Sequence, residues 1–134
     1  MAGGVKVDRR AVFAGAAMAA AVAAVTITLS QAISSLTDTD ADLPLYFVLL
    51  GGLAAGGRVA ALRQPRSPLT HGALAAITGF LVVIAVIVVI RLALGREMAD
   101  PVSLVFHLLM ASSAGIFGGY LATRRAAPEP DPSP

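Results

Sequence analysis

The sequence predicts an all-α membrane protein whose single domain, residues 1–125, is a bundle of four transmembrane helices. Hydrophobic residues make up 57% of the chain and charged residues only 13%, against about 25% charged residues in typical soluble proteins. The apolar residues gather in four long stretches that take up most of the 134 residues. Too few residues remain between these stretches to form a soluble domain, so we expect a multi-pass integral membrane protein.

The four expected spans are residues 11–33, 44–62, 71–95 and 102–123. The first contains no charged residue and follows Arg9 and Arg10, which suit the lipid headgroups at the end of a span. Its apolar run is longer than that of a signal peptide, so we expect an uncleaved anchor. The second span begins beside Asp42 and Pro44, residue types that commonly start helices.

The third and fourth spans carry start signals of the same kind. Thr70 is the expected N-cap of the third span, and Asp100 with Pro101 is expected to start the fourth. The outer half of the third span, residues 81–90, is bulky and β-branched, so it is expected to face lipid or to fill a groove on another helix. Residues 126–134 are rich in proline and acidic residues and are expected to form a disordered cytoplasmic tail.

The distribution of basic residues predicts the orientation of the bundle. If both termini lie on one side of the membrane, that side holds Lys6, Arg9, Arg10, Arg58, Arg63, Arg66, Arg124 and Arg125. The other side then holds only Arg91 and Arg96. Because cytoplasmic loops are enriched in lysine and arginine, we expect both termini in the cytoplasm and the protein in the cell membrane.

Small residues recur four positions apart in the spans. Such a stripe lets two helix backbones approach closely, and close van der Waals contact is a main source of helix association in lipid. Gly52 and Gly56 form a stripe of this kind in the second span, and Gly115 and Gly119 form one in the fourth. These four glycines are therefore expected to line helix-packing seams within the chain. The alternative is a seam between copies in a homo-oligomer.

The two halves of the chain show a partial internal match. A shift of 62 residues places Gly56 and Gly57 on Gly118 and Gly119, and Arg63 on Arg125. The match suggests a tandem repeat of two helical hairpins related by an axis along the membrane normal. Similar composition in any two membrane hairpins would produce the same match, so both readings stay open.

Few polar residues fall at membrane depth. Gln31, Arg91 and His107 come near the outer ends of their spans and could form a polar site for a small ligand or a proton. The alternative is that each of them is satisfied separately. Arg58 can either extend to the inner headgroups or bind an anionic lipid or a partner. His71 is expected to be an interfacial residue beside the inner loop, not a ligand.

The sequence contains no constellation that would carry enzyme chemistry. It has no cysteine, no pair of carboxylates within a span and no metal-ligand spacing, so we expect no enzyme activity, no cofactor and no metal. Basic residues lie singly or in pairs at span ends, which gives no footprint for nucleic acid. The expected partners are the lipid bilayer and a homo-oligomer or membrane-protein partner. The favoured function is an accessory or interaction protein, and the alternative is a subunit of a small oligomeric transporter or channel.

Three segments resemble a family of small four-span bacterial membrane proteins of unknown function. They are LGGLAAGGR at the end of the second span, LTHGALAAITGF at the start of the third, and AGIFGGYLATRR at the end of the fourth. These segments lie within residues 48–125. The resemblance implies the same four-span fold and supplies no activity.

Overall fold

The structure, a computed structural model, describes residues 7–36, 42–97 and 100–125. These residues form four helices and no strand: α1 (Arg9–Leu36), α2 (Asp42–Arg63), α3 (Pro68–Ala93) and α4 (Pro101–Arg125). Each helix is long and apolar enough to cross a membrane. The all-α, four-span prediction is therefore confirmed. The predicted tail, residues 126–134, lies outside the described residues.

The helix starts show where local sequence sets the boundaries. The backbone N–H of Ser103 donates to Oδ2 of Asp100 at 3.0 Å, so Asp100 caps α4 as predicted. The prediction of Thr70 as the N-cap of α3 is wrong, because α3 begins at Pro68 with Ser67 in the N-cap position. Proline is well suited to the first helical turn, since the N–H that it lacks would have no partner inside the helix there.

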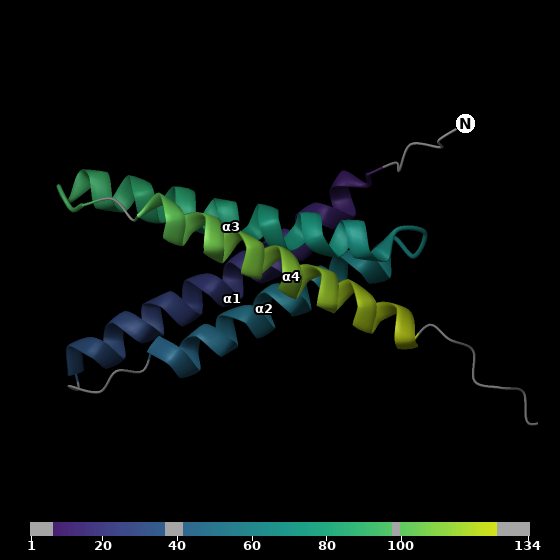
Figure 1. The fold of residues 1–134 in the computed structure, drawn as a ribbon, viewed down its shortest axis with the longest axis horizontal. Helices are drawn as coiled ribbons and strands as arrows, with labels where there is room; N and C mark the ends of the chain where they lie inside the picture. The colour runs from purple at the N-terminus through teal and green to yellow at the C-terminus, as the bar shows by residue number, and fades with distance from the viewer. Residues whose placement is uncertain (1–6, 37–41, 98–99, 126–134) are drawn as a thin grey trace, which may run out of the picture.

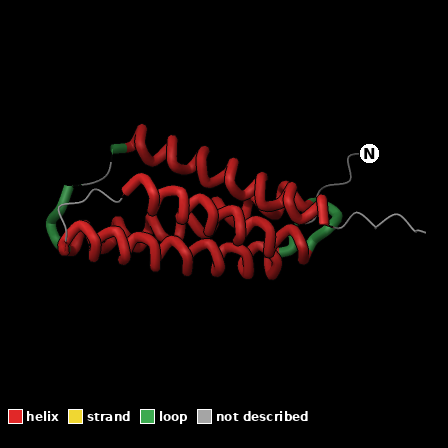
Figure 2. The backbone as a smooth tube through the Cα atoms, turned by 90° about the horizontal axis from the view of Figure 1, so that it is seen from below, coloured by secondary structure: helices red, strands yellow, loops and turns green. Residues whose placement is uncertain are grey.

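The helices form two hairpins that cross each other. α1 packs beside α2 and α3 beside α4, while α1 also contacts α3 and α2 contacts both α3 and α4. Figure 1 shows the α1–α2 pair passing behind the α3–α4 pair, and the two pairs diverging toward the end at which α1 and α3 finish. We call this the outer end, and the opposite end, where α1 begins and α4 finishes, the inner end. Figure 2 shows the helices running lengthwise between these two ends.

The core lies in the middle and inner half of the bundle. Its buried apolar residues are Ala11, Val12, Ala16, Ala19, Ala23, Leu53, Ala60, Ala61, Ala75, Ala76, Phe80, Ala111 and Ala122. Most are alanines, so the helix backbones approach closely where they cross. The outer half of α3 is less buried than the core, since Val82, Val86 and Val89 are all more than half exposed. These positions within residues 81–90 face outward, as the first of the two predicted alternatives requires, whereas Ile84 of the same segment packs against the core.

The two hairpins differ in how they pack. A Cβ at Gly56 would meet Gly15 of α1, in the same hairpin, whereas a Cβ at the matched Gly118 would meet Ala54 of α2, in the other hairpin. In an exact tandem repeat, the α2–α3 and α1–α4 pairs would be equivalent. Among the described residues α2 contacts α3, but α1 does not contact α4. The hairpins share a shape without sharing a set of contacts, so the repeat stays a prediction from the sequence.

Candidate functional site

The predicted packing glycines lie at contacts between helices of this chain. All four, Gly52, Gly56, Gly115 and Gly119, are buried. The first two face α1 and the other two face α3. A Cβ at Gly56 would lie 2.5 Å from the carbonyl oxygen of Gly15 and 2.8 Å from Cβ of Ala19, so only glycine fits there without a shift. Gly51 differs, because a Cβ at this position meets no atom within 4 Å.

α3 contributes two seam glycines that were not predicted from the sequence. A Cβ at Gly72 would meet the backbone of Gly115 on α4, and a Cβ at Gly79 would lie 2.8 Å from Cβ of Ala19 on α1. The signal was present, since Gly72 and Gly79 are seven residues apart and therefore share a helix face. This spacing is easy to overlook, because the bulky, β-branched residues of the outer half dominate the composition of the span.

The residues of the predicted outer polar site lie on separate parts of the bundle. Gln31 is exposed near the end of α1. Nη1 of Arg91 donates to the backbone carbonyl of Glu97 at 3.0 Å, close by in the sequence. His107 lies on α4, which makes no contact with α1 among the described residues. Arg91 and His107 are each bonded to neighbours in the sequence, as the alternative of separate satisfaction requires.

His107 pairs instead with an aromatic residue of α2. Its Nδ1 donates to the backbone carbonyl of Ser103 at 2.6 Å, because a carbonyl can only accept. Its ring meets that of Tyr46 edge to face, with centroids 5.7 Å apart. The Tyr46 hydroxyl is buried and has no hydrogen-bond partner within the described part of the chain. This contact joins α2 and α4 in the outer half of the bundle.

A hydrogen-bond network around a buried histidine at the inner end was not predicted. We call it the inner histidine network, formed by Asp8, Gln64, Ser67 and His71. The side chain of His71 is fully buried, and its Nε2 accepts a hydrogen bond from the backbone N–H of Asp8 at 3.0 Å. Its Nδ1 lies 2.9 Å from both the hydroxyl and the carbonyl oxygen of Ser67. Nε2 of Gln64 donates to the Asp8 carboxylate at 3.5 Å. The network thus links the segment before α1 to the loop between α2 and α3.

The partners of His71 assign its proton. A backbone N–H can only donate and a carbonyl can only accept, so in the neutral ring Nδ1 carries the hydrogen and donates to the Ser67 carbonyl. A catalytic triad needs the opposite: a histidine N–H directed at the carboxylate and a free ring nitrogen beside the serine. In His71 the unprotonated nitrogen, Nε2, already accepts a hydrogen bond from the Asp8 N–H. The arrangement therefore lacks the geometry to take a proton from Ser67.

The Asp8 carboxylate caps the first turn of α1. Its Oδ1 accepts hydrogen bonds from the backbone N–H groups of Arg10 at 2.9 Å and Ala11 at 3.4 Å. The hydrogen bonds from Ala11 and Arg10 lower the pKa of Asp8 below its ordinary value of 3.8, because they favour the charged form. An acidic residue shortly before an apolar run is a recognisable N-cap signal, and Asp8 lies three residues before Ala11, where the run begins.

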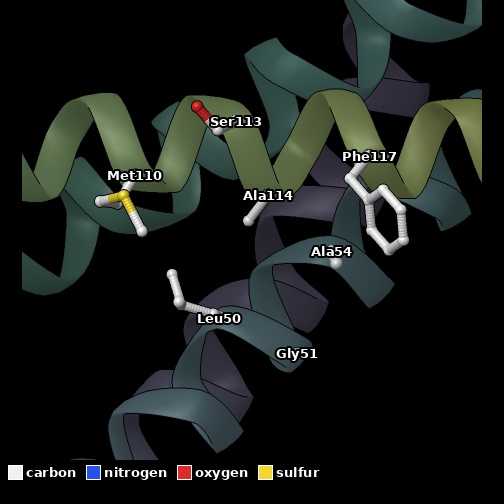
Figure 3. Close-up of a pocket in the computed structure, with 7 residues that line it drawn as sticks. All are labelled: Leu50, Gly51, Ala54, Met110, Ser113, Ala114 and Phe117. Carbon is white, nitrogen blue, oxygen red and sulfur yellow. The ribbon is translucent and has the colours of Figure 1, made fainter.

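An apolar groove, which we call the α2–α4 groove, lies between those two helices. It has a volume of about 360 Å³ and is lined by Leu50, Gly51, Ala54, Met110, Ser113, Ala114 and Phe117. Figure 3 shows Leu50 of α2 and Met110, Ala114 and Phe117 of α4 around the gap between the two helices, whereas Ser113 points away from it. The Ser113 hydroxyl donates to the backbone carbonyl of Leu109 at 2.9 Å, so it has no hydrogen left to offer a ligand. The groove is thus suited to apolar groups.

A second apolar groove, the α1–α3 groove, opens in the outer half of the bundle. It has a volume of about 280 Å³ and is lined by Ala20, Ala24, Ile27, Thr28, Val82, Val83, Val86, Ile87 and Ile90. The Thr28 hydroxyl donates to the carbonyl of Ala24 at 2.8 Å, within its own helix. Small side chains of α1 therefore face branched side chains of α3 across the groove.

Within residues 7–36, 42–97 and 100–125, no three His, Asp or Glu side chains are grouped so that they could hold a metal ion. The resemblance to small four-span bacterial membrane proteins stays a prediction. No protein-family model, no curated protein and no solved structure matches this chain.

Proposed function

We propose that this multi-pass membrane protein is an accessory or interaction protein of the cell membrane, with both termini in the cytoplasm. In this proposal the inner half of the bundle holds the fold together and the outer half receives a membrane-protein partner. The observation that carries the proposal is the contrast between the two halves. The inner half is packed backbone against backbone, whereas the hairpins diverge toward the outer end (Figure 1).

The packing of the inner half favours interaction over transport. Its seams leave no room for even a methyl group at Gly56 or Gly115, so a water-filled path between the helices has no space there. Transport pathways are usually marked by ionisable residues inside the membrane. The buried polar side chains of the described part, Thr26 and His71, are both engaged in hydrogen bonds; the Thr26 hydroxyl donates to the Val22 carbonyl at 2.8 Å.

The outer half offers a surface of the kind that helices recognise in lipid. In the α1–α3 groove, Ala20 and Ala24 leave a hollow beside the branched side chains of Val82 and Val86. Helices in membranes associate through small residues that admit a partner's side chains and through van der Waals contact with branched ones. A partner helix with a complementary stripe would therefore find both features on one face.

Site-specific photo-crosslinking in native membranes tests this function. A photoreactive amino acid at Val86 is expected to give one defined protein adduct, because Val86 lies in the proposed docking face. The same amino acid at Phe13, which is exposed at the inner end of α1, serves as the matched control and should give only lipid adducts. A defined adduct at neither position would contradict the proposal. Solute flux through liposomes that contain only the purified protein would replace it with the transporter alternative.

A further inference from the structure

The α2–α4 groove leads toward two arginines at the inner end. Arg58 follows Gly51 by seven residues, and Arg124 follows Phe117 by seven residues. Seven residues are close to two helical turns, so each arginine lies on the same helix face as the groove residue before it. A Cβ at Gly118 of α4 would lie 2.9 Å from the backbone nitrogen of Arg58, which places this part of α2 directly against α4.

Arg58 carries a charge that the described residues do not balance. It is half-buried, and no hydrogen bond or ion pair joins it to another group in the part of the chain that the structure describes. α4 contains no acidic residue, and the only acid of α2, Asp42, is at the outer end. Asp8, the described acid at the inner end, is bonded to α1 and to Gln64. Partial burial makes an unpaired charge unfavourable, so among the described residues the Arg58 guanidinium is available to pair with an anion.

Arg124 is held in position beside the same path. Its Nε donates to the Tyr120 hydroxyl at 2.8 Å, and its guanidinium carbon lies 5.0 Å from the centre of the Tyr120 ring. These contacts use one of the five guanidinium N–H groups. The others face no acceptor among the described residues, so a second cationic group is available at the inner end of the groove.

We infer that the α2–α4 groove, Arg58 and Arg124 form a binding site for one anionic phospholipid of the leaflet at the inner end. One acyl chain would lie in the groove against Leu50 and Phe117, because the lining is apolar. The phosphate would accept charge-assisted hydrogen bonds from the two guanidinium groups, a geometry that arginine provides well. Basic pockets between transmembrane helices on the cytoplasmic side bind anionic headgroups by the same logic. The site does not depend on the proposed protein partner.

Lipid titration of the purified protein tests the headgroup half of the site. Protein in mild detergent is titrated with dioleoyl phosphatidylglycerol or dioleoyl phosphatidylcholine, and bound lipids are counted by native mass spectrometry. The wild type is expected to bind the first phosphatidylglycerol about tenfold more tightly than phosphatidylcholine. Arg58→Gln should reduce this preference to less than about twofold. Arg66→Gln removes the same charge from an exposed loop position and should leave the preference unchanged. Equal affinity of the wild type for the two lipids, or an unchanged preference in Arg58→Gln, would overturn the inference.

Filling the groove tests the acyl-chain half. Gly51→Leu is expected to fold normally, because a side chain at Gly51 projects into open space, and to weaken binding of both lipids about tenfold. If Arg58→Gln does not fold, Arg124→Gln provides the charge test at an exposed position and should lower the preference at least threefold. Unchanged lipid affinity in Gly51→Leu would refute a chain in the groove. A protein dimer that Gly51→Leu dissociates, with no lipid retained, would show that a second copy occupies the groove instead.

Discussion

A single methyl group at Gly56 should separate α1 from α2. In Gly56→Ala the new carbon would lie 2.5 Å from the Gly15 carbonyl oxygen and 2.8 Å from Cβ of Ala19, whereas ordinary contact begins at 3.4 Å. The nearest atom is backbone, so no side chain can rotate away and α1 must retreat by about 0.9 Å. A gap of this size forfeits about a quarter to a half of each van der Waals contact that it opens.

The magnitude follows from comparison with Gly51→Ala in the same helix. Alanine gains up to about 1 kcal/mol over glycine in helix propensity, and this gain is shared by both variants. Their difference in unfolding free energy therefore measures the cost of overpacking, about 1–3 kcal/mol. Lipid does not offset that cost, because it provides little hydrophobic force to hold two helices together.

The assay is reversible unfolding in mixed micelles of dodecyl maltoside and sodium dodecyl sulfate, followed by circular dichroism. Gly51→Ala is expected to match the wild type or to exceed it slightly in stability, and Gly56→Ala to unfold at a lower mole fraction of sodium dodecyl sulfate. Equal effects of the two substitutions would refute the reasoning. The glycines of residues 51–57 would then reflect only the general abundance of glycine in membrane helices.

The inner histidine network and the orientation yield further predictions. His71→Ala should lower the unfolding free energy by about 1–3 kcal/mol, since a fully buried side chain is lost and the part-buried N–H of Asp8 loses its acceptor. Ser67→Ala, which keeps the backbone carbonyl, should have a smaller effect in the same assay. Because the folded-state pKa of Asp8 is lowered, its capping is fully present above pH 3.8 and is lost as the pH falls below that value. Protection against hydrogen exchange in the first turn of α1, relative to the intrinsic rate at each pH, should therefore fall below pH 3.8 in the wild type and show no such step in Asp8→Asn. Single cysteines at Thr39 and Ala99 should react with an impermeant thiol reagent in intact cells, and one at Ser67 should not; the opposite result would mean an inverted orientation.

The fold was predictable because each span is specified by its own composition. A long uncharged run must form a helix in lipid, and this needs no knowledge of the rest of the chain. The glycine stripes are also visible in the sequence, and Gly56 and Gly115 both lie at helix contacts. They did not reveal which helix each stripe faces, because a stripe of small residues accepts any neighbour of suitable shape.

The candidate sites were less predictable because they depend on which helices are neighbours. Depth in the membrane placed Gln31 and His107 at similar levels, but α1 and α4 do not touch in the described structure. His71 finds its main partner, Asp8, 63 residues away. Such a pair leaves no local pattern in the sequence. The α2–α4 groove likewise has no signature in the sequence, because it forms only where α2 and α4 lie side by side.

The alanine-rich core has a mechanical consequence. Alanine and glycine have no side-chain rotamers, so folding this core costs little side-chain entropy, and the core equally has no rotamers with which to absorb a disturbance. A shift at the seam around Ala19 and Gly56 must therefore move whole helices as rigid rods. α1 has 28 residues and is about 42 Å long, so tilting at a crossing point near its inner half sweeps its outer end through a larger arc. A small change in helix spacing at the inner seam would therefore produce a larger change in the width of the α1–α3 groove at the outer end.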